Sequence, residues 1–213
     1  MIDGRRCAIP ADTVLQVRGL RFAYPDQPAL FDGWSADIGA GLTRLQGEAG
    51  KSTLLRLLAG ALAGDGRVVL AGRRLDTDRA AWRREACWID PRDPAWDPLR
   101  PDELMAEQQA LHPGFDATAW QRHLAGFDLA SHRGKSMLQL STGTRRKVAL
   151  AAALSAGCAL TLLDEPTAGL DRPAIGWLEQ ALTEAAGEPG RAWLLASAWG
   201  LEDALPWAGT ITL

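Results

Sequence analysis

The chain of 213 residues lacks a long apolar segment, an excess of positive charge and a regular set of cysteines. Its longest uncharged stretch, Val148 to Leu163, is shorter than the roughly 20 apolar residues that cross a membrane as a helix, and Gly157 interrupts it. The N-terminal stretch MIDGRRCAIPADT has no apolar run of the kind that a signal peptide needs. We therefore expect a chain that is neither secreted nor membrane-spanning, so any membrane function requires another chain to supply the spanning helices.

Cysteine, histidine and charge exclude several classes of protein. The three cysteines, Cys7, Cys87 and Cys158, are far apart, odd in number and without metal-ligand spacing, so we expect reduced thiols in a cytoplasmic protein. The net charge of −3, with both signs interspersed, gives no indication of a nucleic-acid partner. The three histidines and the scattered tryptophans are expected to be solvated and packing side chains, respectively. These residues are His112, His123 and His132, and Trp82, Trp88, Trp96 and Trp120.

The order of the elements predicts an α/β fold with a mostly parallel sheet, because strands alternate with helices along the chain. Strands are expected at Thr13 to Val17, Arg21 to Tyr24, Leu42 to Gln46, Arg67 to Ala71, Ala159 to Leu163 and Ala192 to Ser197. Helices are expected at Ser52 to Leu62, Val148 to Ser155 and Pro173 to Ala186. Residues 98–140 read as a helical insertion with two helices, 102–112 and 116–127.

A candidate phosphate-binding loop, GEAGKST, stands where the strand ending at Gln46 turns into a helix. Unpaired backbone N–H groups and the helix dipole favour a bound phosphate at such a place. In a P-loop the lysine neutralises the β- and γ-phosphates and the next hydroxyl holds Mg²⁺, which assigns these roles to Lys51 and Ser52. The plain alternative is a glycine-bearing turn before an ordinary helix. The residues of this phosphate loop are Gly47, Glu48, Ala49, Gly50, Lys51, Ser52 and Thr53.

The phosphate loop is irregular. A P-loop has four residues between its first glycine and the Gly-Lys pair, whereas only Glu48 and Ala49 separate Gly47 from Gly50. Either two residues are missing, which removes roughly 7 Å of chain, or Leu45 and Glu48 stand where glycines belong. Both readings predict weakened ATP binding.

Two carboxylates follow a buried strand in LTLLDEP. They are expected at the carboxyl edge of the sheet beside the phosphate loop. There Asp164 would hold Mg²⁺ through water, and Glu165 would polarise the attacking water as a general base. The alternative for these two acids alone is a solvated acidic turn that caps a helix.

With LSTGT at Leu140–Thr144, the series GEAGKST, LSTGT, LTLLDEP and AGLD resembles the ATP-binding subunit of ABC transporters over nearly the whole chain. The resemblance implies a P-loop core with an antiparallel N-terminal β-subdomain. It also implies that Ser141 and the backbone of Gly143 contact the γ-phosphate of ATP bound by the opposite subunit, although LSTGT without its neighbours is better explained as a plain Ser/Thr N-cap. Tyr24 resembles the aromatic residue that stacks on adenine, or else is an ordinary core or surface aromatic. Asp171 resembles the carboxylate at the subunit junction and is also placed to cap a helix.

Three positions depart from the family pattern. The lid glutamine aligns with Arg92 in IDPRDPAWDPL, and a guanidinium cannot ligate a metal. The switch histidine aligns with Ala198, and no histidine follows His132. The signature reads STGT where SGGQ is usual, which removes one of two glycines that permit close backbone approach.

The resemblance predicts one domain, residues 1–213, that binds ATP and Mg²⁺ and hydrolyses ATP to power a separate transmembrane permease. It would pair with a second ATP-binding subunit at the cytoplasmic face of the membrane. A second hypothesis is a catalytically weak subunit that serves as the structural or regulatory half of a heterodimer. A third, a soluble ATPase of this family that works on DNA or ribosomes, lacks a supporting basic or coiled-coil segment. The sequence leaves the cargo and the direction of transport open.

Overall fold

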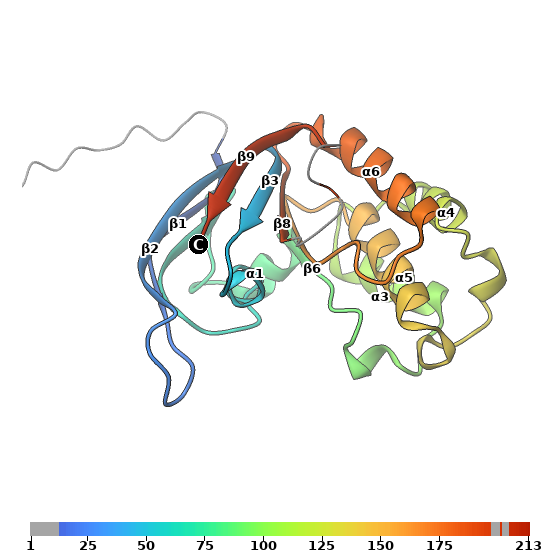
Figure 1. Cartoon of the computed structure of the whole chain (residues 1–213), viewed down its shortest axis with the longest axis horizontal. Helices are drawn as coiled ribbons and strands as arrows, with labels where there is room; N and C mark the ends of the chain where they lie inside the picture. Colours follow the sequence, from blue (N-terminus) through green and yellow to red (C-terminus); the bar gives the residue numbers. More distant parts are fainter. Residues whose placement is uncertain (1–12, 197–200, 202–204) are drawn as a thin grey trace, which may run out of the picture.

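Two β-sheets lie side by side in the computed structural model of the chain, which describes residues 13–196, 201 and 205–213 (Figure 1). The strands are β1 (Thr13–Phe22), β2 (Phe31–Gly39), β3 (Gly41–Gln46), β4 (Asp65–Leu70), β5 (Arg73–Arg74), β6 (Ala86–Trp88), β7 (Leu160–Asp164), β8 (Ala192–Ala196) and β9 (Trp207–Thr212). The α-helices are α1 (Lys51–Leu58), α2 (Arg79–Glu85), α3 (Pro101–Leu111), α4 (Ala117–Gly126), α5 (Thr142–Ser155) and α6 (Arg172–Ala186). Short 3₁₀ turns occupy Pro94–Trp96, Ala130–His132 and Met137–Gln139.

The first sheet is antiparallel, in the order β2-β1-β4-β5. The two strands expected at 13–17 and 21–24 form one strand, β1, whose register shifts between Val17 and Leu20 at Gly19, where φ is +61°. The expectation that Tyr24 belongs to a strand is wrong: β1 ends at Phe22, and the turn after Tyr24 is closed by Gln27 N–H donating to the Tyr24 carbonyl. The expected antiparallel N-terminal sheet is therefore present.

The second sheet is parallel throughout, in the order β6-β7-β8-β3-β9. Its central strands are buried on both faces because helices cover both, and the side chains alternate between them. On β8, Leu194 packs toward α1 and the first sheet, whereas Trp193 and Leu195 pack with α5 and α6. This parallel sheet confirms the expected α/β class.

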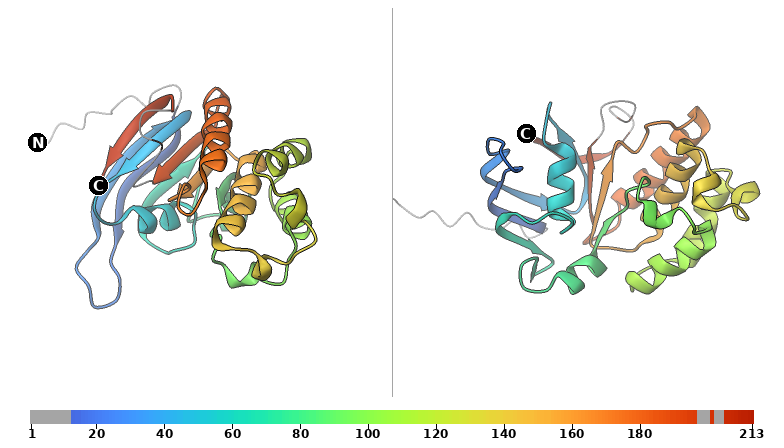
Figure 2. Two further views of the ribbon diagram at one scale, coloured as in Figure 1. Left: turned by 45° about the vertical axis from the view of Figure 1, so that its right-hand side comes forward. Right: turned by 90° about the horizontal axis from the view of Figure 1, so that it is seen from below.

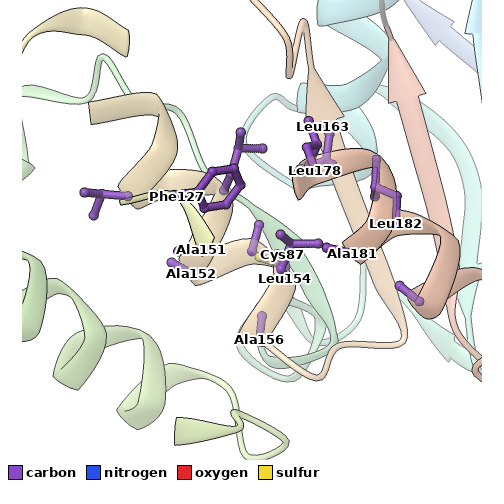
Figure 3. Close-up of a cluster of buried hydrophobic side chains, with 14 of the residues drawn as sticks. Cys87, Phe127, Ala151, Ala152, Leu154, Ala156, Leu163, Leu178, Ala181 and Leu182 are labelled. Atoms are coloured by element: carbon purple, nitrogen blue, oxygen red, sulfur yellow. The ribbon is translucent and has the colours of Figure 1, made fainter. Parts of the chain in front are cut away.

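Helix α1 lies between the two sheets, and α5 and α6 cover the far face of the parallel sheet (Figure 2). A cluster of buried hydrophobic side chains joins α5 to α6 through small and branched residues, with Phe127 and Cys87 beside them (Figure 3). Residues such as Ala152 and Ala181 let the two helices approach closely.

The helices differ from expectation mainly at their ends. Helix α1 stops at Leu58, four residues early, because the chain turns through Gly60 at φ +71°. Helix α5 begins at Thr142 rather than Val148, because Ser141 caps it. The helices expected near 102–112 and 116–127 are α3 and α4, opened by Pro101 and capped by Asp116, respectively.

Candidate functional site

The phosphate loop turns from β3 into α1 through two glycines in the left-handed region, Gly47 at φ +137° and Gly50 at φ +88°. Only glycine adopts these angles without strain. Gly50 is the N-cap of α1, so the first N–H groups of that helix have no side-chain cap. The Lys51 ammonium group folds back and donates to the Gly47 carbonyl at 2.5 Å. The loop therefore holds a cation and free helix N–H groups at one place.

Leu45, which one reading of the loop puts at a glycine position, lies inside β3, is fully buried and pairs with Ala196 of β8. Glu48 and Ala49 are the exposed tip of the loop. Leu213 packs against Gly47, where an added Cβ would stand 3.1 Å from the Leu213 carbonyl oxygen.

Tyr24 stands beside the start of α1. Its hydroxyl lies 3.0 Å from Oγ1 of Thr53, and its ring meets Phe22 edge-on at 4.9 Å. Thr53 is buried, whereas Tyr24 is only half-buried. The Tyr24 ring thus lies next to the start of the helix that follows the phosphate loop.

Asp164 and Glu165 lie at the carboxyl edge of the parallel sheet, as the sequence predicts. Asp164 ends β7, and Glu165 follows at φ +45°, a conformation that costs a non-glycine residue about 1–3 kcal/mol. The Glu165 N–H donates to the Ala196 carbonyl at 2.7 Å and fixes this turn. Both acids line one hollow of about 310 Å³ with Ser52 of α1. We call it the catalytic hollow.

Two arginines also line the catalytic hollow. Arg92 donates to Asp90, with Nε 3.1 Å from Oδ1, and its side chain is 68% exposed. Burial raises the pKa of Asp90, but hydrogen bonds from the N–H and the guanidinium of Arg92 outweigh this effect. The pKa of Asp90 is therefore below its ordinary value. The Arg92 guanidinium is therefore held by a carboxylate at the rim of the hollow.

Arg146, which the sequence did not single out, donates to the Glu165 carbonyl oxygen from α5. Burial first, and then the neighbouring Arg92, lower the pKa of Arg146 below its ordinary value. The Arg146 guanidinium thus holds the backbone of the strained turn at Glu165. The only feature of the sequence that could have indicated this role is a cation about one turn into the helix that follows LSTGT.

The signature segment, Leu140–Thr144, caps α5 and touches the loop after β7. The Ser141 hydroxyl accepts from the Thr144 N–H at 3.2 Å, which is the plain N-cap. An added Cβ at Gly143 would stand only 2.4 Å from the Gly169 carbonyl oxygen. Gly143 is therefore needed for the close approach of this segment to the Gly169 backbone.

Asp171 combines two contacts at the start of α6. It accepts from the Ala174 N–H at 2.9 Å and pairs with Lys147 at 2.7 Å. The hydrogen bond from Lys147 is the main cause that lowers the pKa of Asp171. The expected cap is present, and the carboxylate remains 56% exposed. The position of the switch histidine, Ala198, lies outside the described residues.

The expectation of solvated histidines is wrong for two of the three. His112 and His123 are each 2% exposed, whereas His132 is half-buried. Burial lowers the pKa of His123 from 6.5 to about 4, with Arg122 as a second cause, and the ring packs edge-on against Trp177. The packing role expected for the tryptophans holds for Trp82 and Trp120, which are buried.

Although the cysteines lack metal-ligand spacing in the sequence, the fold brings two of them together with a histidine. Cys87, His112 and Cys158 form a buried group whose ligand atoms all lie within 4.8 Å of one another. We call this group the Cys–His cluster. Sequence spacing could not reveal it because its members come from three separate elements. Among the described residues, no helix is long and apolar enough to cross a membrane.

Comparisons of the sequence with known proteins identify a family and several relatives. Residues 42–168 match the family model described as "ABC transporter". The chain is similar to the "Cytochrome c biogenesis ATP-binding export protein CcmA" of Pseudomonas fluorescens (strain Pf0-1), with 34% identity over 74% of the chain and 76% of the relative. The protein of that name from Pseudomonas syringae pv. syringae (strain B728a) is 35% identical over 83% of the chain and 84% of the relative.

The fold has close counterparts among solved structures. A protein titled "Structure of ATP binding subunit of ABC transporter" superposes with a TM-score of 0.77 and 23% identity, over 87% of this chain and 80% of the other. This likeness shows the P-loop ABC fold.

Proposed function

The chain belongs to the ABC transporter family, and from this premise we propose how its residues act. It is an ATP-binding subunit that hydrolyses ATP to power transport through a separate membrane permease. The comparisons do not favour the catalytically weak alternative. One observation carries the assignment of residues: Ser52, Asp164 and Glu165 line the same hollow, although they come from two distant segments. We treat residues 1–213 as one domain with its helical part at about 98–140.

We assign triphosphate binding to the phosphate loop. The free N–H groups at the start of α1 and the Lys51 ammonium group bind and neutralise the phosphates. Tyr24 offers its half-buried ring to the adenine base, with its hydroxyl tied to Thr53. Gly47, Glu48, Ala49 and Gly50 form the shortened turn beneath the phosphates.

Mg²⁺ would be held by oxygen donors of the catalytic hollow. Ser52 and Asp164 supply a hydroxyl and a carboxylate, the ligand types that Mg²⁺ prefers together with water and substrate phosphates. When bound, the ion neutralises charge on the phosphates. Arg92 adds a cation at the rim of the hollow but cannot ligate the metal.

Glu165 is the proposed general base. Its carboxylate orients the attacking water and takes its proton as the water oxygen bonds to the γ-phosphorus and the bond to ADP breaks. The fixed, strained turn at Glu165 holds the side chain at the hollow before ATP arrives. Because Arg92 replaces the family's glutamine, we expect turnover slower than in subunits with that glutamine.

We propose that two ATP-binding subunits close head to tail around ATP. Ser141 and the Gly143 backbone present a helix N-terminus to the γ-phosphate bound by the other subunit. Asp171, exposed at the start of α6, reaches the junction between subunits while Lys147 orients it. The permease would hold this pair at the cytoplasmic face of the membrane.

The names of two relatives support a proposal about the cargo. Because both are named for export in cytochrome c biogenesis, we propose that this chain serves the same process. Disruption of its gene should lower the amount of c-type cytochrome in the cell, measured by haem-linked peroxidase staining. Normal cytochrome content would reject this cargo and leave the ATPase assignment intact.

Phosphate release by the purified protein tests the enzymatic assignment. We expect ATP- and Mg²⁺-dependent release that Glu165→Gln lowers by at least about 10²-fold, as removal of a reacting group does. Glu179→Gln, at a half-buried position of α6 that does not line the catalytic hollow, is the matched control and should leave the rate unchanged. Release that survives Glu165→Gln would contradict the proposed base.

A further inference from the structure

The Cys–His cluster lies away from the catalytic hollow. Cys87 is the central residue of β6, Cys158 precedes β7, and His112 is the C-cap of α3. Asp164 ends β7 at the other edge of the sheet, four strand steps or about 13 Å beyond Leu160, and Cys158 precedes Leu160. The cluster is therefore separate from the residues that the ATPase reaction uses.

The three donors are buried and close enough to share one ion. Cys87 is 0% exposed, and Cys158 and His112 are each 2% exposed. Cys158 Sγ lies 3.1 Å from His112 Nδ1, and all ligand atoms lie within 4.8 Å of one another. Donors on a tetrahedral zinc ion stand roughly 3.5–3.8 Å apart, given bonds of about 2.3 Å to sulfur and about 2.0 Å to nitrogen. A small adjustment of the three side chains would therefore bring their ligand atoms to the distances that a tetrahedral zinc ion requires.

The donor chemistry selects the kind of metal. Two thiolates and an imidazole suit zinc(II) or copper(I), whereas magnesium and calcium require oxygen ligands. Two thiolates also cancel the charge of a divalent ion, which removes the cost of burying an unpaired charge. The Arg84 carbonyl oxygen lies 3.2 Å from His112 Nδ1 and 3.6 Å from Cys158 Sγ, where it accepts a hydrogen bond from the cluster.

An entry path and local supports are present. A hollow of about 230 Å³ opens at His112 and is lined by Arg83, Gln108 and Trp88. The loops that carry His112 and Cys158 meet at Gly114 and Gly157, where an added Cβ at Gly157 would stand 1.9 Å from the Gly114 carbonyl oxygen. Arg191 fixes the Cys158 backbone, with its Nε donating to the Cys158 carbonyl at 3.1 Å. Two loops distant in sequence are thus locked together around the donors.

We propose that Cys87, His112 and Cys158 form a binding site for a thiophilic metal ion of the zinc(II) or copper(I) class. The ion would join β6, the end of α3 and the start of β7. Since the chain runs from Trp88, the last residue of β6, directly to Asp90 at the catalytic hollow, the ion would also fix the strand that leads to the Asp90–Arg92 pair.

Metal binding by the full-length reduced protein tests the proposal. Protein stripped with a chelator would be titrated with Zn²⁺, with Cu⁺ under anaerobic conditions, and with Co²⁺ as a spectroscopic probe. We expect about one ion per chain and thiolate-to-cobalt charge-transfer absorption. Cys87→Ser, Cys158→Ser and His112→Gln should each weaken affinity by at least about tenfold, whereas Cys7→Ser should not.

Two further measurements keep the test decisive. ATP binding by each variant checks that the variant folds. X-ray absorption at the metal edge of the wild-type protein needs no variant and should show two sulfur neighbours at about 2.3 Å. Absence of binding at micromolar metal, binding that survives all three substitutions, or a metal without sulfur neighbours would overturn the proposal. A Cys87–Cys158 disulfide in protein isolated under reducing conditions would also overturn it.

Discussion

The contact between Gly143 and Gly169 gives a quantitative prediction. A Cβ added at Gly143 would lie 2.4 Å from the Gly169 carbonyl oxygen, about 0.6 Å inside the closest approach that real Cβ atoms show. The Cβ is fixed directly to the backbone of α5, and the carbonyl oxygen belongs to the backbone at Gly169. Neither atom can therefore move aside as the end of a long side chain would. Overpacking of this kind costs about 1–3 kcal/mol, and the higher helix propensity of alanine offsets less than about 1 kcal/mol of it.

Gly143→Ala should therefore lower the free energy of unfolding by about 1–2 kcal/mol, measured by urea denaturation. For a chain of this size, that corresponds to a fall in Tm of about 2–8 °C. It should also slow ATP hydrolysis, because the displaced Gly169 leads directly to Asp171.

Gly176→Ala is the matched control. Gly176 lies on the exposed face of α6 with no atom within 4 Å of an added Cβ, so alanine should stabilise the protein by about 0.5–1 kcal/mol. The two substitutions are the same change in the same kind of element and should differ in sign. A Gly143→Ala variant as stable as the Gly176→Ala variant would refute the close approach of the two segments.

Three further predictions concern other parts of the molecule. Burial lowers the pKa of His123 from 6.5 to about 4, so the unfolded state binds more protons than the folded state between these pH values. The free energy of unfolding should therefore fall by about 2 kcal/mol from pH 7 to pH 5. Urea titrations should show that His123→Gln reduces this loss and that His132→Gln does not. Lys147→Met should lower stability by less than about 1 kcal/mol, because Asp171 is half-exposed, yet slow ATPase turnover, and a loss above 2 kcal/mol would show a larger structural role. Insertion of two small residues between Ala49 and Gly50 should tighten ATP binding in calorimetry, and unchanged affinity would mean that the short loop is already compensated.

Strong local patterns made the core of the fold predictable. The apolar run before Asp164 indicated β7, because a short run of this kind is typical of a strand buried on both faces. Asp171 with Pro173 indicated the start of α6, because a capping aspartate followed by an early proline is typical of a helix N-terminus. The phosphate loop and the acidic pair were placed at one sheet edge for the same reason, and Ser52, Asp164 and Glu165 do line one hollow.

The parts that the sequence did not predict depend on tertiary contacts. Strand β2 has only two buried residues, Phe31 and Ile38, so its sequence lacks a regular buried face, and β6 has only three residues. Arg146 gained its position under Glu165 only from the packing of α5 beside β7. The Cys–His cluster depends on the strand order that sets β6 beside β7, which no local pattern encodes.

The central claim is that Lys51 and Asp164 act on one triphosphate and its metal, and a double-mutant cycle of ATP affinity tests it most directly. Calorimetric titration with ATP and Mg²⁺ would compare the wild type, Lys51→Ala, Asp164→Asn and the double variant. We predict that each single change weakens binding by at least about tenfold and that the double variant loses at least about 1 kcal/mol less than the sum, since both residues serve the same ligand. Strictly additive losses, or a wild-type protein that does not bind ATP with Mg²⁺ at millimolar concentration, would contradict the account.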